Sequence, residues 1–292
     1  MRKVLVSFVA AAMLFGANAF ASEASKAESN KAVAEAKVKA QKEQKEVKIV
    51  QEAVEAVALT HKVLEELEKG NKEQAIKDLE KAIGKLEVVL SAPNAPALIP
   101  IDSSLEIVDF PGTLQDIKTA VITAKALLKE NRIQEARLIL DTLRSEIVLK
   151  VVNLPLASYP AALKLAAKFL HENRIDEAKN VLAQALATFV EVDIVTPIPL
   201  LQAIHLVEIA QKVAKEDRKK ALEYLKEAKL ALKKAEALGY VSESETTYEM
   251  LEDMIEKVEK EIKGKNKAEK LFEELLEKLR EFKEKAVKSI NK

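Results

Sequence analysis

The chain has 292 residues, with 47 basic and 47 acidic side chains, and its hydrophobic fraction of 48% is enough for a buried core, which excludes wholesale disorder. The absence of Cys excludes disulfides, thiolate metal sites and a cysteine nucleophile, and six Gly leave little material for phosphate-binding loops. Aromatic residues at 4% and a net charge of zero give no support to nucleic-acid binding, which relies on base stacking and phosphate neutralisation.

The N-terminus has the three parts of a secretory signal peptide. Arg2 and Lys3 precede an apolar run from Val4 to Phe15, and Ala19-Phe20-Ala21 supplies a small-residue cleavage pattern. The apolar run is too short to span a bilayer comfortably as a helix, although an uncleaved membrane anchor is the alternative. We therefore predict a signal peptide over residues 1–21, a periplasmic protein with a net charge of −2, and no stable membrane span after cleavage.

Residues 23–69 are rich in good helix formers. Residues 22–46 form a charged helical N-terminal extension that has little to bury and either frays or pairs with another chain. From Val47 onward a 3-4 alternation indicates a short coiled-coil seam, made of Val47, Val50, Val54, Val57, His61 and Leu64. We interpret His61 as a hydrogen-bonded core histidine rather than a ligand.

A second helix is predicted over residues 72–90, after a stop at Gly70-Asn71. The Pro-bearing segment 91–102 cannot be helical but is apolar, so we expect it to pack against the body of the protein. Residues 104–110 then resemble a strand that closes at Pro111-Gly112.

An internal repeat with an offset of 42 residues is the clearest signal in the chain, and it relates residues 120–161 to residues 162–204. Lys129-Glu-Asn-Arg-Ile-Gln-Glu-Ala136 matches His171-Glu-Asn-Arg-Ile-Asp-Glu-Ala178. We interpret each copy as a helix, a tight polar turn and a second helix. The small Ala near the start of the second helix lets the two helices approach closely. A weaker third copy spans residues 214–221, and residues 70–75 are similar in character. The period is typical of helical repeat proteins, but the tetratricopeptide pattern is missing.

The β-branched segments 146–152 and 189–195 each precede a Pro and are predicted to be short strands or extended segments beside 104–110. The alternative is that residues 147–151 continue their helix. Further helices are expected over 199–215, 217–237, 244–264 and from 267 to the end, with Ser242–Glu245 as capping residues. The predicted fold class is mainly α, a multi-helix bundle of helical-hairpin repeats with a few short β or extended segments, in a single helical domain over 47–292.

Motifs for chemistry are missing. The three His residues lack HxxxH or HExxH spacing, and the chain has no GxSxG, P-loop or dinucleotide fingerprint. The many carboxylates alternate with Lys at helical spacing, which is typical of a solvated face. We therefore predict no catalytic, metal or cofactor residues. Arg132 and Arg174 occupy equivalent turns, where they either grip an anion or bridge acids on neighbouring helices.

A groove for a ligand or partner is the one candidate site. We expect the Pro-bearing segments 91–112, 153–160 and 195–200 to gather at one end of the helical body. The candidate lining residues are Ile99, Asp102, Tyr159, Asp193, His205 and Tyr240.

Several short motifs resemble the YfdX family of bacterial periplasmic proteins. They are Ala97-Leu-Ile-Pro-Ile-Asp102, Leu154-Pro-Leu-Ala-Ser-Tyr-Pro160, Pro197-Ile-Pro-Leu200, and Leu238-Gly-Tyr240 followed by Tyr248. The resemblance covers about residues 45–285. It implies a helical, exported protein linked to stress or acid tolerance, and it supplies no catalytic residues.

Three functional hypotheses follow. The first is a non-enzymatic periplasmic protein that binds a periplasmic partner protein or a small ligand in a stress-related role. The second is an oligomeric structural or chaperone-like envelope protein, which would be a homo-oligomer. The third, a hydrolase or metal enzyme that uses scattered acids, has the least support.

Overall fold

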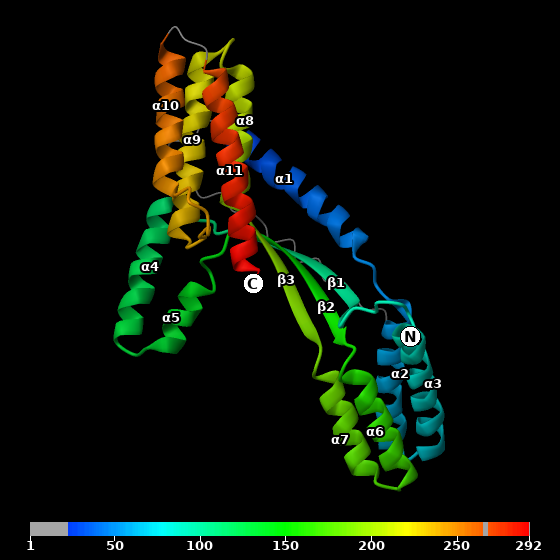
Figure 1. Cartoon of the computed structure of the whole chain (residues 1–292). Helices are drawn as coiled ribbons and strands as arrows, with labels where there is room; N and C mark the ends of the chain where they lie inside the picture. The colour runs from blue at the N-terminus through cyan, green and yellow to red at the C-terminus, as the bar shows by residue number, and fades with distance from the viewer. Residues whose placement is uncertain (1–22, 265–267, 292) are drawn as a thin grey trace. The chain divides into compact units, whose positions relative to one another are not determined.

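The computed structural model describes residues 23–264 and 268–291, so the predicted signal peptide lies outside the described residues. The described chain is mainly helical with one antiparallel sheet in the order β1-β2-β3, which confirms the predicted fold class (Figure 1). Its elements are α1 (Glu23–Glu46), α2 (Gln51–Glu68), α3 (Lys72–Leu90), β1 (Leu98–Val108), α4 (Leu114–Lys129), α5 (Ile133–Leu140), β2 (Glu146–Pro155), α6 (Tyr159–His171), α7 (Ile175–Leu186), β3 (Val190–Pro197), α8 (Ile198–Val213), α9 (Arg218–Ala237), α10 (Tyr248–Lys263) and α11 (Glu269–Ile290).

A helical hairpin followed by a strand occurs three times, as α2–α3–β1, α4–α5–β2 and α6–α7–β3. The chain reverses between the two helices at Gly70, Asn131 and Asn173, whose φ angles are 79°, 58° and 59°. Gly, and to a lesser degree Asn, tolerate this left-handed conformation. A fully buried Ala lies five residues after each of these turn residues, at Ala75, Ala136 and Ala178. The same supersecondary unit, with the same kind of turn, therefore recurs along the chain.

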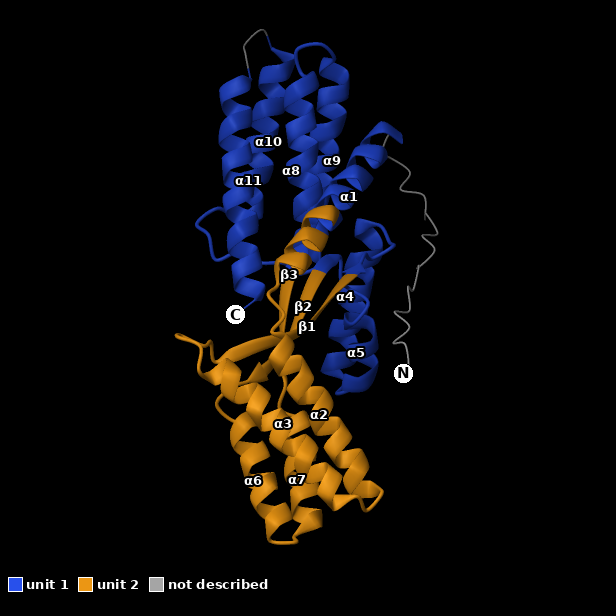
Figure 2. Ribbon diagram, turned by 90° about the vertical axis from the view of Figure 1, so that its right-hand side faces the viewer, with its two compact units in different colours: residues 1–37, 107–147, 195–292 blue, residues 38–106, 148–194 orange. Residues whose placement is uncertain are grey.

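The chain divides into two compact units (Figure 2). Unit 1 comprises residues 1–37, 107–147 and 195–292, and unit 2 comprises residues 38–106 and 148–194. Each unit is described by itself below. A single domain over residues 47–292 stays a prediction.

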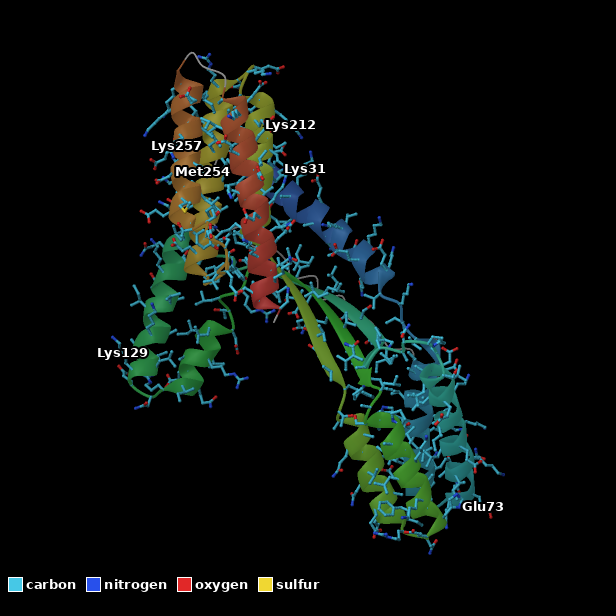
Figure 3. The ribbon with its side chains drawn as sticks, in the orientation of Figure 1. Lys31, Glu73, Lys129, Lys212, Met254 and Lys257 are labelled. Carbon is cyan, nitrogen blue, oxygen red and sulfur yellow. The ribbon has the colours of Figure 1, made fainter. Side chains whose placement is uncertain are left out.

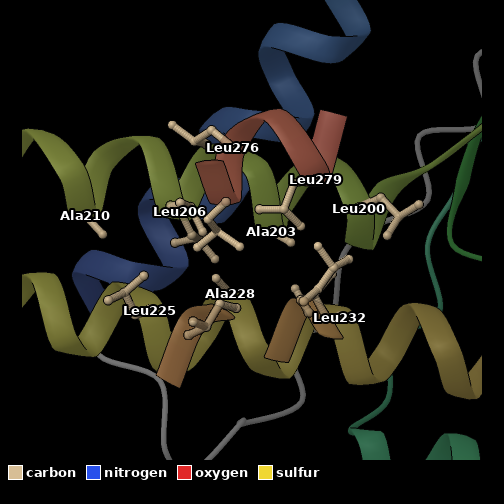
Figure 4. Packing of buried hydrophobic residues seen from close by; sticks show 14 of the residues in the cluster. Leu200, Ala203, Leu206, Ala210, Leu225, Ala228, Leu232, Leu276 and Leu279 are labelled. Atoms are coloured by element: carbon tan, nitrogen blue, oxygen red, sulfur yellow. The ribbon is translucent and has the colours of Figure 1, made fainter. Parts of the chain in front are cut away.

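Unit 1 is built on the α8–α9 hairpin, against which α10 and α11 pack. Figure 4 shows Leu side chains from α8, α9 and α11 meeting between the helices, with Ala203 and Ala228 among them. The small Ala side chains let the helices approach closely, and the Leu side chains fill the remaining space. Charged side chains such as Lys212 and Lys257 project outward from the bundle (Figure 3). The α4–α5 hairpin is attached through contacts of α4 with α9.

Unit 2 consists of two helical hairpins packed face to face. Helix α3 contacts α6 and helix α2 contacts α7. The Lys72 Nζ donates to Asn173 Oδ1 over 3.0 Å, so the turns of both hairpins lie at the same end. The buried cluster between them contains large side chains of both hairpins, namely Leu79, Leu86, Leu163, Leu170 and Leu182.

The predicted seam from Val47 to Leu64 is wrong. Helix α1 ends at Glu46 and α2 begins only at Gln51, so Val47 and Val50 precede the helix. The buried face of α2 is displaced by one position from the predicted one, and His61 is exposed rather than a core histidine. The physical reason is close helix packing, since the face that carries Ala53 and Ala56 lets α3 approach more closely than a face of Val residues.

Two element boundaries also differ from the prediction. Strand β1 begins at Leu98, earlier than expected, and the Pro100 carbonyl accepts a hydrogen bond from the Val50 backbone N–H. Helix α10 begins at Tyr248, where the Thr247 hydroxyl accepts from the Met250 N–H over 3.2 Å. Thr247 is therefore the N-cap, and Ser242–Glu245 belong to the preceding loop.

Candidate functional site

A hydrogen-bonded network centred on Tyr240 lies in unit 1. Gly239 ends α9 with a φ of 85°, which only Gly adopts without strain, and the turn brings Tyr240 back toward the bundle. The Tyr240 hydroxyl accepts from the Ser145 backbone N–H over 2.9 Å and donates to Glu146 Oε2 over 3.1 Å. Both hydrogen-bonding functions of this buried hydroxyl are therefore used within the protein.

Ser145 connects three segments that are distant in sequence. Its hydroxyl donates to Asp109 Oδ1 over 2.8 Å and accepts from the Phe110 N–H over 3.0 Å. Its carbonyl accepts from the Ile198 N–H at the start of α8 over 2.8 Å. Ser145 thus fixes the residues that follow β1, the start of β2 and the start of α8.

Tyr248 supports the network from α10. Its hydroxyl donates to the Tyr240 carbonyl over 2.6 Å, and its ring meets the Phe282 ring edge-on with the centroids 4.7 Å apart. Burial raises the pKa of both Tyr240 and Tyr248. The two hydroxyls are therefore protonated donors at neutral pH and are not available as bases.

Lys234 on α9 lies near the acids at this end of unit 1. Its Nζ donates to the Gly112 carbonyl over 3.4 Å. Burial lowers the pKa of Lys234, and burial raises the pKa of Asp109 and of Glu227. The attraction between Lys234 and these carboxylates opposes the effect of burial on all three pKa values.

Tyr159 is fully buried in unit 2, in the same cluster as Ile99. Its ring stacks on Phe189 with the centroids 5.7 Å apart. The neighbouring Thr60 hydroxyl donates to the Ala56 carbonyl, and within the described residues the Tyr159 hydroxyl has no hydrogen-bond partner. Burial raises the pKa of Tyr159 to about 12.

His205 on α8 faces the acidic side chains of α1. Its Nε2 lies 3.0 Å from Glu28 Oε2, and its Nδ1 lies 3.9 Å from Glu35 Oε2. The His205 side chain is 12% exposed, against 61% for Glu35. This contact ties the N-terminal half of α1 to unit 1.

The six predicted groove residues are divided between the units. Ile99, Asp102, Tyr159 and Asp193 belong to unit 2, and His205 and Tyr240 belong to unit 1. Ile99 and Tyr159 lie in one buried cluster, whereas Asp102 and Asp193 are exposed on strands β1 and β3. Two of the Pro-bearing segments do meet, because the Leu156 N–H donates to the Ala97 carbonyl over 2.9 Å. A groove shared by all six residues stays a prediction.

The alternative roles of Arg132 and Arg174 are decided by their contacts. The Arg132 guanidinium donates to Glu130 and Glu135, and Arg174 donates to Glu172 and Glu177 in the equivalent turn. Both bridge acids of the two helices that they connect, as the simpler interpretation predicted. Arg174 also lies 4.2 Å above the ring of Phe169, where it gains a cation–π contact.

Sequence reasoning missed the central part of the Tyr240 network. Ser145 is an ordinary polar residue before a β-branched run, and Lys234 is one of many lysines on a Lys-rich helix. Nothing in the local pattern separates them from solvated residues. Only the partners brought by α9, α8 and the end of β1 give them a role.

Comparison with known proteins assigns a segment of the chain to a family. Residues 56–195 match the model of the family described as YfdX protein. This segment belongs to the YfdX family. The YfdX segment begins within α2 and ends within β3, so it contains nearly all of the three hairpin-and-strand units. The resemblance inferred from the short motifs is confirmed for these residues.

The solved structure of Salmonella Typhi YfdX is similar to this chain at 18% identity. The similarity covers 52% of this chain and 94% of the other, with a TM-score of 0.37. No curated protein matches. Across residues 23–264 and 268–291, the helices are too short or too polar to cross a membrane. The same residues contain no group of three or more His, Asp or Glu side chains arranged to hold a metal ion.

Proposed function

We propose that the protein is exported to the periplasm and acts there as a non-enzymatic YfdX-type protein that binds a partner protein in a stress-related role. Export is supported by the charged tip, apolar run and Ala-x-Ala pattern of residues 1–21. The family resemblance supports the stress-related role. The satisfied hydroxyls of Ser145, Tyr240 and Tyr248 favour binding over catalysis, because none of them is poised as a nucleophile.

One observation supports partner binding most strongly. The α4–α5 hairpin exposes several large aliphatic side chains along 27 residues, and exposure of this density is typical of an interaction surface. The exposed fractions are 66% for Ile122, 45% for Leu128, 59% for Ile133, 71% for Leu138 and 45% for Leu140.

Complementation tests this function. A strain that lacks the gene is compared under envelope or acid stress with strains that carry the wild type or the double variant Leu128→Glu/Leu140→Glu. We expect the wild type to restore survival and the double variant to fail, although both accumulate in the periplasmic fraction. Full rescue by the double variant, or accumulation of the wild type in the cytoplasm, would contradict the proposal.

The second candidate function is a chaperone-like envelope protein, and the same exposed side chains favour it. A holdase binds unfolded chains through exposed apolar surface, so it would suppress aggregation of an unrelated denatured protein. The Leu128→Glu/Leu140→Glu variant would lose that suppression. Equal light scattering with and without the wild-type protein would exclude this candidate.

A further inference from the structure

The two copies of the internal repeat have the same turn but different surroundings. Ala124 and Ala136 of the α4–α5 hairpin are 2% and 0% exposed, and their equivalents Ala166 and Ala178 in α6–α7 are both 0% exposed. These Ala residues lie between the two helices of each hairpin. The internal packing of the two hairpins is therefore alike.

The outward face of the two hairpins differs. Leu170 and Leu182 of α6–α7 are fully buried in the cluster that the hairpin shares with α2–α3. Their equivalents, Leu128 and Leu140, are each 45% exposed. Ile133 is likewise 59% exposed, whereas its equivalent Ile175 packs against the buried cluster. The α4–α5 hairpin therefore exposes the apolar positions that the equivalent hairpin α6–α7 buries against α2–α3.

The packing in unit 2 shows which arrangement covers such a face. Helix α3 contacts α6, helix α2 contacts α7, and the turns of both hairpins lie at the same end. The first helix of each hairpin thus contacts the second helix of the other, which is the contact pattern of a two-fold axis. Two identical hairpins from two copies of the chain can therefore make the same helix–helix contacts.

We propose that the α4–α5 face, defined by Leu128, Ile133 and Leu140, pairs with the same face of a second copy of this chain. The pairing is two-fold symmetric, so that α4 of each copy lies beside α5 of the other and the two Asn131 turns lie at the same end. This inference rests on the proposed function and names the partner.

The charges of α4 and α5 are compatible with self-pairing. Helix α4 carries Lys118, Lys125 and Lys129 against Asp116, whereas α5 with its C-cap Asp141 carries two acids and one Arg. Placing α4 beside the partner's α5 therefore brings opposite net charges together. Figure 3 shows Lys129 near the tip of the hairpin.

Sedimentation velocity of the purified protein over a wide concentration range tests the proposal. We expect a reversible dimer whose dissociation constant rises by at least about 100-fold in Leu128→Glu/Leu140→Glu, because buried interface centres dominate affinity. Leu138→Glu is the matched control. Leu138 lies on the same hairpin and is 71% exposed. It lies outside the proposed face, because the equivalent residue Asn180 is also exposed in α6–α7. We expect this control to dimerise like the wild type.

Crosslinking gives a second measurement that does not depend on a charged variant. The chain has no Cys, so Leu128→Cys and Leu138→Cys each introduce a single thiol. With a short bis-maleimide linker, Leu128→Cys should form a covalent dimer and Leu138→Cys should not. A wild type that is monomeric at every concentration, or a dimer that survives both Glu substitutions, would overturn the proposal. If the protein binds a different partner, the double variant would still fail in the complementation assay although the wild type does not dimerise. Failure of self-pairing is therefore distinguishable from failure of the proposed function.

Discussion

Replacing Asp78 with Asn tests whether a buried charge stabilises the α2–α3 hairpin. The Asp78 side chain is fully buried, and its carboxylate lies 2.9 Å from Lys62 Nζ and 3.3 Å from Lys81 Nζ. Gln74 Nε2 donates to the same carboxylate over 2.9 Å. A buried carboxylate is tolerated only with such partners, since desolvation alone would neutralise it.

The magnitude follows from the pKa of Asp78. Hydrogen bonds from Lys62 and Gln74 lower this pKa from 3.8 to about 2, although burial opposes them. That difference corresponds to about 2.5 kcal/mol of stability, because the folded state holds the ionised form more strongly than the unfolded state does. Lys62 and Lys81 are 51% and 63% exposed, so solvent screening reduces the effect. We expect Asp78→Asn to cost about 1–2 kcal/mol at pH 7.

The pH dependence has a definite sign. Since the pKa of Asp78 is depressed in the folded state, its stabilisation is complete above about pH 4 and disappears as the pH falls toward 2. The free energies of unfolding of the wild type and of Asp78→Asn should therefore differ most at pH 5–7. They should converge between about pH 4 and 2.

Tyrosine provides a probe for unit 2. Of the four Tyr residues, only Tyr159 lies in unit 2, so urea titration followed by fluorine NMR of fluorotyrosine-labelled protein reports its unfolding separately. Glu55→Gln is the control, because the Glu55–Lys85 pair lies on the same hairpin but both side chains are 43% exposed. It should leave stability unchanged. The reasoning would be refuted if, at pH 7, Asp78→Asn lowers the free energy of unfolding no more than Glu55→Gln does.

Three further predictions concern single hydroxyls and one turn. Tyr159→Phe removes a buried hydroxyl without a hydrogen-bond partner among the described residues, so calorimetry should show equal or higher stability, by up to about 1 kcal/mol. Tyr240→Phe removes the bonds to Ser145 and Glu146 and should cost about 1–3 kcal/mol in the same assay; an unchanged melting temperature would contradict the central role of the network. Asn173→Ala should cost about 1 kcal/mol in chemical denaturation because its φ is 59°, whereas Asn173→Gly should be close to neutral, and equal losses in both variants would show that φ is not the cause.

Local structure was largely predictable from the sequence. The period of 42 residues, the polar turns and the buried Ala positions depend on interactions between neighbouring residues, and all three are found in the structure. The strands were predictable for the same reason, because β-branched residues before a Pro favour extended backbone. The predicted seam on α2 was wrong because periodicity identifies an apolar face but does not show which of two adjacent faces packs against the neighbouring helix.

The candidate groove was predictable only in part. Tyr159 and Ile99 lie in apolar Pro-bearing segments that were expected to pack against the body of the protein, and both are buried. Tyr240 was singled out at the end of its helix, but its partners Ser145 and Glu146 are about 95 residues away in sequence. Hydrogen bonds over such separations leave no local pattern.

The sequence by itself determined that the chain is mainly helical and that short polar turns separate pairs of helices in a repeated pattern. These properties depend on backbone preferences and on contacts within one hairpin. Only the tertiary structure decided which copies of the repeat are covered. Leu128 and Leu170 occupy equivalent positions in nearly identical motifs, yet one is 45% exposed and the other is fully buried. The physical reason is that burial depends on whether another hairpin packs against the face, and that is a property of the assembled chain rather than of the motif.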